Sequence, residues 1–233
     1  MTTQAVKATV GSGTFSKIFN LTATDGQWDG NSLTDSISNQ PLGILIPGAR
    51  ISNVCATYSN GLMAWRIQNA QTLQVSRRGF ASKVGFSCYD SCKVSPYNIN
   101  PNDIISVYPL PVDATSSQSN CLAWVTTTKG TELFKAQDIP DSTSTALTTV
   151  VNSQSLGDNM FGSTLQSIWV QAEDDCTVNK VEIFDNSGAV VFTAFGGVRN
   201  APGSSSNYYN IDVSGLGIAI GRGWAIKVNC TSA

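Results

Sequence analysis

Carboxylate side chains gather in one segment of the chain, where their types and spacing could support acid–base or metal chemistry. Glu173, Asp174 and Asp175 come shortly before the stretch VEIFDNSGAVVF, which contains Glu182 and Asp185. A glycosidase needs two carboxyl groups that face each other roughly 5 to 9.5 Å apart, one of them with a raised pKa. Calcium is bound by similar oxygen ligands, but the calcium-loop pattern D-x-[DN]-x-[DN]-G is absent from this segment.

The same residues could instead form two strands and the turns beside them, with no catalytic or metal-binding role. Alternation over 177–184 places Val181 and Ile183 on the core face of a strand and Glu182 on its outer face. Residues 185–188 read Asp-Asn-Ser-Gly, which is the composition of a turn whose glycine accepts a positive φ. We therefore predict a hairpin with solvated turns, and we assign no catalytic, cofactor-binding or metal-binding residue.

Other catalytic and cofactor chemistry has little support in the composition. The chain contains no histidine, which excludes the Ser-His-Asp and Cys-His nucleophile systems. Cys88 and Cys92 form a lone CxxxC pair that cannot complete a zinc site, so the cysteines are expected to be mostly buried free thiols. The glycine-rich stretch 215–223 departs from the dinucleotide fingerprint and precedes a predicted strand instead of a helix. We expect no cofactor and no enzymatic activity.

The charge and hydropathy of the 233 residues also limit the partners of the chain. Charged residues make up 13% of the sequence and the formal net charge is −2, so the basic surface that nucleic-acid binding needs is missing. No apolar run approaches the length of a membrane span, and the amino terminus does not resemble a secretory signal. A polar but weakly charged surface suits packing against other protein copies or glycan-like ligands.

Short apolar runs broken by Gly, Asn, Asp, Ser and Pro predict an all-β protein, an antiparallel β-sandwich or jelly roll. The predicted strands are 43–58 with a break at Pro47-Gly48, 62–68, 72–78, 103–110, 121–128, 131–136, 165–173, 177–184, 189–195, 208–213 and 224–230. Segments 121–136 and 179–194 align without gaps, which suggests two similar half-sheets or lobes.

Residues 1–35 are predicted to form an amino-terminal arm that docks on a neighbouring subunit, with an ordinary first strand as the alternative. The arm precedes a β-sandwich domain over 36–233, which could divide into lobes 36–140 and 141–233. The candidate contact residues for another subunit or a ligand are Phe15, Ile18, Phe19 and Trp28. Trp28 is the one tryptophan that does not lie within an apolar strand.

The chain resembles the accessory structural proteins of tailed-phage virions, which include capsid decoration (cement) proteins and knob-like β-sandwich proteins. The resemblance lies in the histidine-free, Ser/Thr/Asn/Gly-rich composition, the polar amino-terminal extension, and the hairpin VEIFDNSGAVVF after LQSIWVQAEDD. It implies a homo-oligomer, often a trimer, that binds the major capsid protein or other virion proteins and is located in the virion. A carbohydrate-binding, lectin-like jelly roll is the alternative, suggested by Trp28 and the Asn/Asp-rich loops.

Overall fold

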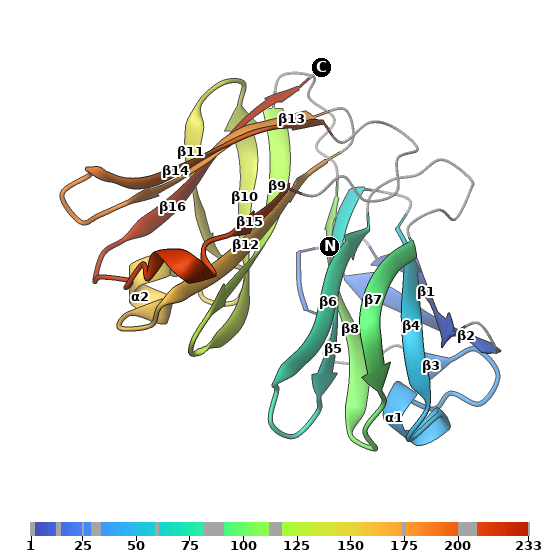
Figure 1. Cartoon of the computed structure of the whole chain (residues 1–233). Coiled ribbons are helices and arrows are strands. Elements are labelled where there is room, and N and C mark those ends of the chain that lie inside the picture. The colour runs from blue at the N-terminus through green and yellow to red at the C-terminus, as the bar shows by residue number, and fades with distance from the viewer. Residues whose placement is uncertain are drawn as a thin grey trace. The chain divides into compact units, whose positions relative to one another are not determined.

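The computed structural model describes residues 3–12, 15–24, 26–28, 34–58, 61–81, 91–111, 118–173, 176–199 and 209–232. The protein is all-β, with 64% of its residues in strands, and every strand pair is antiparallel (Figure 1). The chain divides into two compact units. Unit 1 comprises Met1–Pro111 with Pro202–Ser206, and unit 2 comprises Val112–Ala201 with Asn207–Ala233. The sequence analysis placed the boundary between lobes at 140/141.

Unit 2 is built from one eight-stranded sheet in the order β14-β13-β16-β11-β10-β9-β12-β15. Its strands are β9 (Gln118–Thr127), β10 (Gly130–Pro140), β11 (Ser144–Thr149), β12 (Leu165–Ala172), β13 (Cys176–Phe184), β14 (Val190–Arg199), β15 (Tyr209–Asp212) and β16 (Ala225–Ser232). Two short helices, α2 (Leu156–Met160) and η1 (Ser214–Leu216), lie in its loops. The sheet is nearly closed, because the Tyr209 hydroxyl on edge strand β15 donates a hydrogen bond to the Phe195 carbonyl on edge strand β14.

Unit 1 contains two smaller sheets, with the strand orders β3-β2-β1-β4-β7 and β6-β5-β8. Its elements are β1 (Thr3–Ser12), β2 (Phe15–Thr24), β3 (Thr34–Asp35), α1 (Leu42–Leu45), β4 (Arg50–Thr57), β5 (Gly61–Asn69), β6 (Val75–Ala81), β7 (Ser91–Asn98) and β8 (Asp103–Pro111). Residues of the predicted arm therefore form the β1–β2 hairpin, and β1 also pairs with β4. Whether this hairpin contacts a neighbouring subunit stays a prediction.

The two units have the same topology. When each strand of unit 1 is replaced by the strand eight places later, its two sheets become β11-β10-β9-β12-β15 and β14-β13-β16. Joined between β16 and β11, these are the single sheet of unit 2. A short helix follows the third strand in both units. The chain is thus a tandem duplication of one fold, and the two-residue strand β3 explains why the sheet of unit 1 is interrupted where β11 bridges to β16.

The register of the strands is duplicated as well. Equivalent partners face each other across equivalent strands, and all of them are fully buried: Ala8–Phe19 and Ala123–Phe134, Val10–Val54 and Val125–Ile168, Ile67–Ile105 and Ile183–Ile226. Because a shift of one residue would turn every side chain to the opposite face, this agreement is a strong test of equivalence.

The repeat suggested by the sequence is a different one. Segments 121–136 and 179–194 are the β9–β10 and β13–β14 hairpins, and both belong to unit 2. Their registers differ, because Phe134 pairs with Ala123 whereas the aligned Phe192 pairs with Ile183 and not with Val181. The spacing that relates the two units is about twice as long as the spacing of the sequence repeat.

Most of the predicted strands are present. The start of the predicted strand 43–58 is instead helical in α1, and strands β1, β2, β3, β7 and β11 were not among the predicted strands, although an ordinary first strand was the alternative for residues 1–35. β7 and β11 consist mostly of polar residues, so their apolar alternation is weak. No helix in the described ranges is long and apolar enough to span a membrane.

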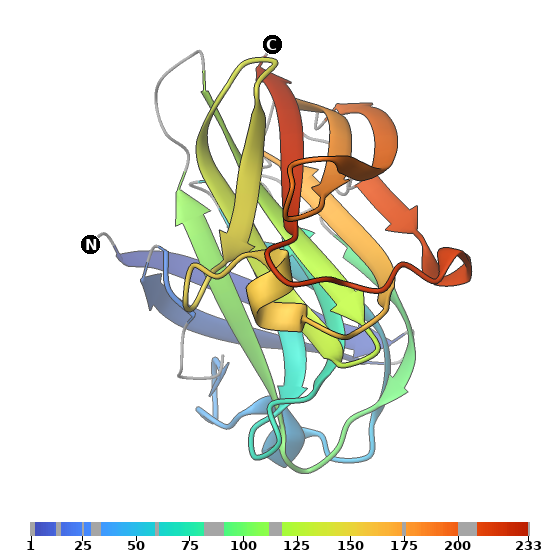
Figure 2. The ribbon, with the colours of Figure 1, turned by 90° about the vertical axis from the view of Figure 1, so that its left-hand side faces the viewer.

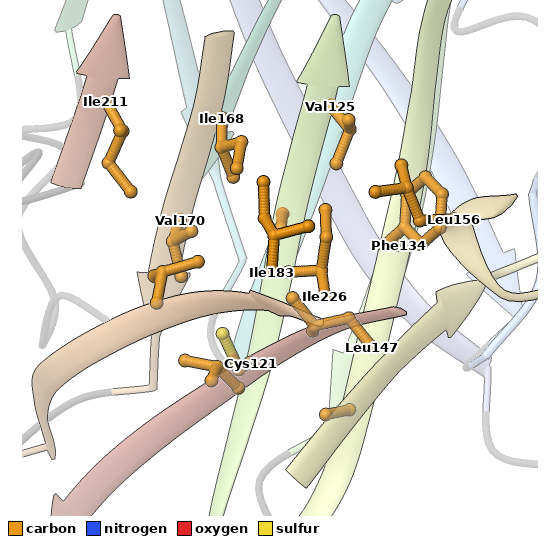
Figure 3. Packing of buried hydrophobic residues seen from close by; sticks show 14 of the residues in the cluster. Cys121, Val125, Phe134, Leu147, Leu156, Ile168, Val170, Ile183, Ile211 and Ile226 are labelled. Atoms are coloured by element: carbon orange, nitrogen blue, oxygen red, sulfur yellow. The ribbon is translucent and has the colours of Figure 1, made fainter. Parts of the chain in front are cut away.

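Each unit has its own hydrophobic core. In unit 2, Val125 of β9 and Ile168 of β12 point toward Ile183 of β13 and Ile226 of β16, so side chains from the two halves of the curved sheet interdigitate (Figure 3). In unit 1 the equivalent layer contains Val10, Val54, Ile67 and Ile105, together with the fully buried ring of Trp65.

Candidate functional site

The acidic residues of the predicted hairpin do not form a pair. Glu173 precedes β13 and Asp185 follows it, so the nine residues of β13 hold these carboxylates about 30 Å apart. That separation is far beyond the distance between the two carboxyl groups of a glycosidase. Asp174 and Asp175 lie outside the described residues. Among the residues that the structure describes, no group of His, Cys, Asp and Glu could hold a metal ion.

Each described acid has a structural partner. The Glu173 side chain is buried and accepts hydrogen bonds from the backbone N–H of Asn120, at 3.1 Å, and from its side-chain amide, at 3.4 Å. The Asp185 carboxylate accepts from the Ser187 hydroxyl and from backbone N–H groups of the turn, which lowers its pKa. Asp185 thus has the predicted role of a turn-forming acid. Glu173 does not lie in a solvated turn as predicted, because it is buried and binds Asn120 of β9.

Glu182 lies on the face of β13 opposite to Val181 and Ile183, as predicted, but only 8% of it is exposed. Its Oε1 is 2.9 Å from the Lys180 ammonium, and its Oε2 accepts a hydrogen bond from the Ser144 hydroxyl at 3.1 Å. These two contacts, one of them from β11, cover a carboxylate that alternation alone predicts to be solvated.

The prediction of buried free thiols is confirmed for Cys121, Cys176 and Cys230. Burial raises the pKa of the Cys121 thiol well above its usual value and that of Cys176 to about 12, although the Ser119 hydroxyl donates a hydrogen bond to the Cys176 sulfur. Because the thiolate is the reactive form, the raised pKa values disfavour nucleophilic roles for Cys121 and Cys176. Cys88 lies outside the described residues, as does the side chain of Cys92.

The glycine-rich segment 215–223 forms the end of η1 and a loop that leads into β16, as predicted. Gly217 at the end of η1 and Gly223 have positive φ angles of 63° and 70°. A Cβ atom at Gly221 would collide with the indole ring of Trp224. The glycines therefore serve the turn and the packing of Trp224.

The four predicted contact residues do not form one surface. Phe19 is fully buried in the core of unit 1, Ile18 on the opposite face of β2 is 38% exposed, and the side chain of Phe15 lies outside the described part of the chain. The Arg66 guanidinium lies 3.7 Å from the centre of the Trp28 ring, which also meets Tyr108 edge-on. One face of the Trp28 ring is therefore already occupied within the protein.

A second candidate site is the end of each unit that carries its helix, which we call the helix-bearing end. In unit 1 it comprises the loops 36–49, 70–74 and 99–102; in unit 2 it comprises the loops 128–129, 150–164, 185–189 and 213–224. Antiparallel pairing brings these loops to one end of each sheet, where α1 and α2 are seen in Figures 1 and 2.

Equivalent hydrogen bonds tie the loops together at both helix-bearing ends. The N–H groups of Gly48 and Gly162 donate to the carbonyls of Ile99 and Ile220, at 2.7 and 3.0 Å. In return, Ile99 and Ile220 donate to the carbonyls of the residues that follow the two glycines. Gly48 and Gly162 also share positive φ angles of 76° and 72°, so the same backbone turn is built twice.

The loop before each helix is also duplicated. Asp35 in unit 1 and Thr149 in unit 2 donate their N–H groups to the carbonyls of Gln40 and Gln154, both at 2.9 Å. Their side chains accept hydrogen bonds at different points of the loop: Asp35 from the N–H groups of Ile37 and Ser38, and Thr149 from that of Gln154. At the tips of the two loops stand Ile37, 89% exposed, and Val151, 66% exposed. An aliphatic side chain is thus presented at the same place in both units.

Six of the ten exposed large hydrophobic side chains among the described residues belong to the helix-bearing ends: Ile37, Ile44, Leu73, Val151, Phe161 and Leu216. Gathered exposed apolar groups mark interaction sites on soluble proteins. The sequence analysis missed both ends. The dipeptide Leu-Gly occurs in both helices, at 42–43 and 156–157, but it also occurs at 216–217 and so does not identify them.

Comparison of the chain with protein-family models, with curated proteins and with solved structures finds no match in any of the three. The fold and the site together define the class of the protein: an all-β protein with two copies of one eight-stranded fold, each with exposed apolar side chains at its helix-bearing end.

Proposed function

We propose that the chain is a non-enzymatic structural protein of a virion, which decorates and stabilises a phage capsid through contacts between β-sheet units. In this proposal it assembles as a homo-oligomer, with a trimer favoured, and binds the major capsid protein or other virion proteins. The observation that carries the proposal is the duplication of one unit together with its exposed apolar end. A chain that carries the same contact surface twice is suited to repeated packing among identical subunits.

Further support comes from the roles of the polar groups. The described acids and thiols each have a structural partner or are buried, so they are used to hold turns and strands. The low charge of the chain reduces electrostatic repulsion between closely packed copies. Interfaces of such copies rely on shape complementarity and on hydrogen bonds, which sheets and Ser/Thr/Asn-rich loops can supply.

The finer fold assignment, an antiparallel β-sandwich or jelly roll, belongs to the same proposal. It is supported by the core of unit 2, where β9 and β12 pack their apolar side chains on those of β13 and β16 (Figure 3). In both units the first four strands follow the Greek-key order 4-1-2-3 that is common in sandwiches. The carbohydrate-binding alternative loses its main support because Arg66 covers one face of Trp28.

Binding to capsid shells tests this function directly. Purified protein is mixed with shells from particles stripped of it, and sedimentation measures how many copies bind per shell. We expect saturable binding in a fixed ratio to the capsid subunits, and a higher temperature of shell disruption when the protein is bound. Absence of binding to the shells would refute the proposal.

A further inference from the structure

We propose that Cys121 and Cys230, two buried thiols on facing strands of unit 2, form a disulfide bond when the protein passes from a reducing into an oxidising solution. The bond joins β9 to β16 across the core, so the reduced protein carries a latent cross-link. The inference does not depend on the proposed function. In a virion the bond forms after release from the host cytoplasm, where thiols are kept reduced.

The first argument is the place of the two residues in the core. Cys121 of β9 and Cys230 of β16 are both fully buried in the hydrophobic cluster of unit 2. β10 and β11 separate the two strands in the sheet, but the sheet curves so that Cα atoms of β9 and β16 approach within 8 Å. Figure 3 shows the Cys121 side chain at the point where β16 crosses β9. A disulfide, whose Cα atoms lie about 4.4 to 6.8 Å apart, fits such an approach.

The third described thiol of unit 2 is placed less well for a bond. Cys176 of β13 is a diagonal neighbour of Cys230 across the β13–β16 pair, and diagonal Cα atoms lie about 7 to 8 Å apart. The Cys176 sulfur accepts a hydrogen bond from the Ser119 hydroxyl at 3.1 Å. After burial, the neighbouring Cys230 thiol is the largest cause that raises the pKa of Cys121, ahead of Cys176. Cys230 is therefore the closer partner of Cys121.

Unit 1 has no equivalent pair of thiols. The register that relates the units places Val6 at the position of Cys121 and Pro109 at the position of Cys230. Neither residue can form a disulfide, so the cross-link belongs to unit 2 alone. The fold itself therefore does not require thiols at these two positions.

The reaction is a thiol–disulfide exchange with a small-molecule disulfide such as oxidised glutathione. One cysteine thiolate attacks a sulfur atom of the oxidant, and a glutathione thiolate leaves. The second cysteine thiolate attacks the protein sulfur of this mixed disulfide, forms the bond between Cys121 and Cys230, and releases the second glutathione. The two cysteines thus lose two electrons to the oxidant, and their two protons pass to the released thiolates.

Access to the thiols sets the rate of this reaction. Burial raises the pKa of Cys121, so the reactive thiolate is scarce in the closed core. The exchange therefore begins when the end of β16 separates locally from the sheet. That end is held by Asp141, whose carboxylate accepts hydrogen bonds from the Ser232 N–H and hydroxyl groups, each at 2.8 Å. The contact between Asp141 and Ser232 opposes the opening that the reaction needs.

The test uses the full chain, purified in reduced form and incubated with oxidised glutathione. Remaining thiols are alkylated in denaturant, and intact mass with peptide mapping counts and locates them. We expect the loss of two alkylated thiols and a linked peptide pair that contains Cys121 and Cys230, both reversed by a reductant. Cys230→Ala should abolish this loss, whereas Cys176→Ala, the matched control from the same core, should leave the bond unchanged.

Two further measurements address access to the thiols and the effect of the bond. Asp141→Ala should raise the rate of bond formation about tenfold, because it removes hydrogen bonds to a charged group. The oxidised protein should have a higher denaturation midpoint than the reduced protein, because a bond between residues far apart in sequence restricts the unfolded chain. Circular dichroism of the reduced variants verifies that they are folded.

Several results would overturn the inference. The wild type and Asp141→Ala could both keep all six cysteines as thiols after the incubation. The bond could map to Cys176, the reaction could stop at the mixed disulfide with glutathione, or oxidation could be confined to the cysteines of unit 1. A bond between Cys121 and Cys230 that leaves the denaturation midpoint unchanged would refute its role as a cross-link of the core.

Discussion

Unit 1 and unit 2 share their strand order and register but fill equivalent positions with different side chains. Trp65 faces Gly79 across β5 and β6, whereas the equivalent pair in unit 2 is Val181 and Ala194. Unit 1 thus pairs a large residue, Trp, with Gly, whereas unit 2 pairs Val with Ala. The comparison shows that the same strand register accepts different combinations of side chains in the two cores.

The outer face differs as well. Arg66 forms a cation–π contact with Trp28 in unit 1, whereas Glu182 at the equivalent position of unit 2 accepts a hydrogen bond from Ser144. The two equivalent positions therefore carry opposite charge. What the units share at the helix-bearing ends is the positive φ of Gly48 and Gly162 and their backbone hydrogen bonds to Ile99 and Ile220.

The largest expected effect is at the glycine of the shared Leu-Gly dipeptide. A Cβ atom at Gly43 would lie 2.5 Å from the carbonyl oxygen of Asn100, and one at Gly157 would lie 2.5 Å from that of Gly221. Because backbone cannot move aside easily, Gly43→Ala and Gly157→Ala should each lower the free energy of unfolding by about 3 kcal/mol or more. Urea denaturation measures this.

Gly215→Ala serves as the control for these glycine variants, because a Cβ atom there meets nothing within 4 Å. It should change the free energy of unfolding by less than about 0.5 kcal/mol. If Gly43→Ala or Gly157→Ala is tolerated as well as the control, the two helix-bearing ends are not built in the same way.

A smaller effect on the free energy of unfolding is expected at the contact between Gly79 and Trp65. Gly79→Ala would place a Cβ atom 2.6 Å from the Trp65 ring, so it should cost about 2 kcal/mol of unfolding free energy. The same change combined with Trp65→Phe should cost clearly less than the sum of the two single changes, because the smaller ring makes room. A double-mutant cycle by denaturation measures the coupling, and strict additivity would argue against the volume exchange.

The capping residues predict a difference in pH dependence between the units. Backbone and hydroxyl hydrogen bonds from Ser38 are the main cause that lowers the pKa of Asp35, whereas the equivalent Thr149 does not titrate. A carboxylate with a lowered folded-state pKa adds stability above its unfolded pKa of about 3.9 and loses it as the pH falls through the folded value. Asp35→Thr should therefore flatten the acid side of the stability profile.

The reverse change, Thr149→Asp, provides the matched comparison, because it should steepen the same profile. Chemical denaturation between neutral pH and the acid transition gives the slopes, and amide shifts of Ile37 and Ser38 report the turn itself. Identical slopes for the wild type and Asp35→Thr would contradict the equivalence of the two caps.

The smallest effect is expected for the outer pair of unit 2. Glu182→Gln removes the ion pair with Lys180, whose side chain is 33% exposed, but retains the volume and an acceptor for Ser144. Partly solvated ion pairs contribute little, so the loss should be below about 1 kcal/mol. A thermal scan of the variant beside the wild type measures it, and a loss as large as that of Gly157→Ala would mean that this carboxylate is part of a larger network.

Much of the fold was predictable from alternation and turn residues. The strands with strong apolar runs, such as β5, β9 and β13, were located, and the Asp-Asn-Ser-Gly turn before β14 was recognised. Strands β7 and β11 were missed because their own residues carry little apolar pattern, and β1 and β2 lie in the segment that was predicted to be an arm. The helix-bearing ends could not be predicted, since their exposed side chains come from loops that are separated along the chain and are joined by backbone hydrogen bonds.

The sequence by itself determined the all-β class, the turn positions and the lack of histidine chemistry, because these depend on local residue types. Only the tertiary structure decided which strands pair, and therefore that the chain contains one fold twice. The physical reason is that strand register is fixed by the burial of paired side chains such as Val10–Val54 and Val125–Ile168. Any apolar residue of suitable size can be buried at such a position. The equivalence of the two units is therefore visible in their buried positions and backbone turns, but not in the identity of their residues.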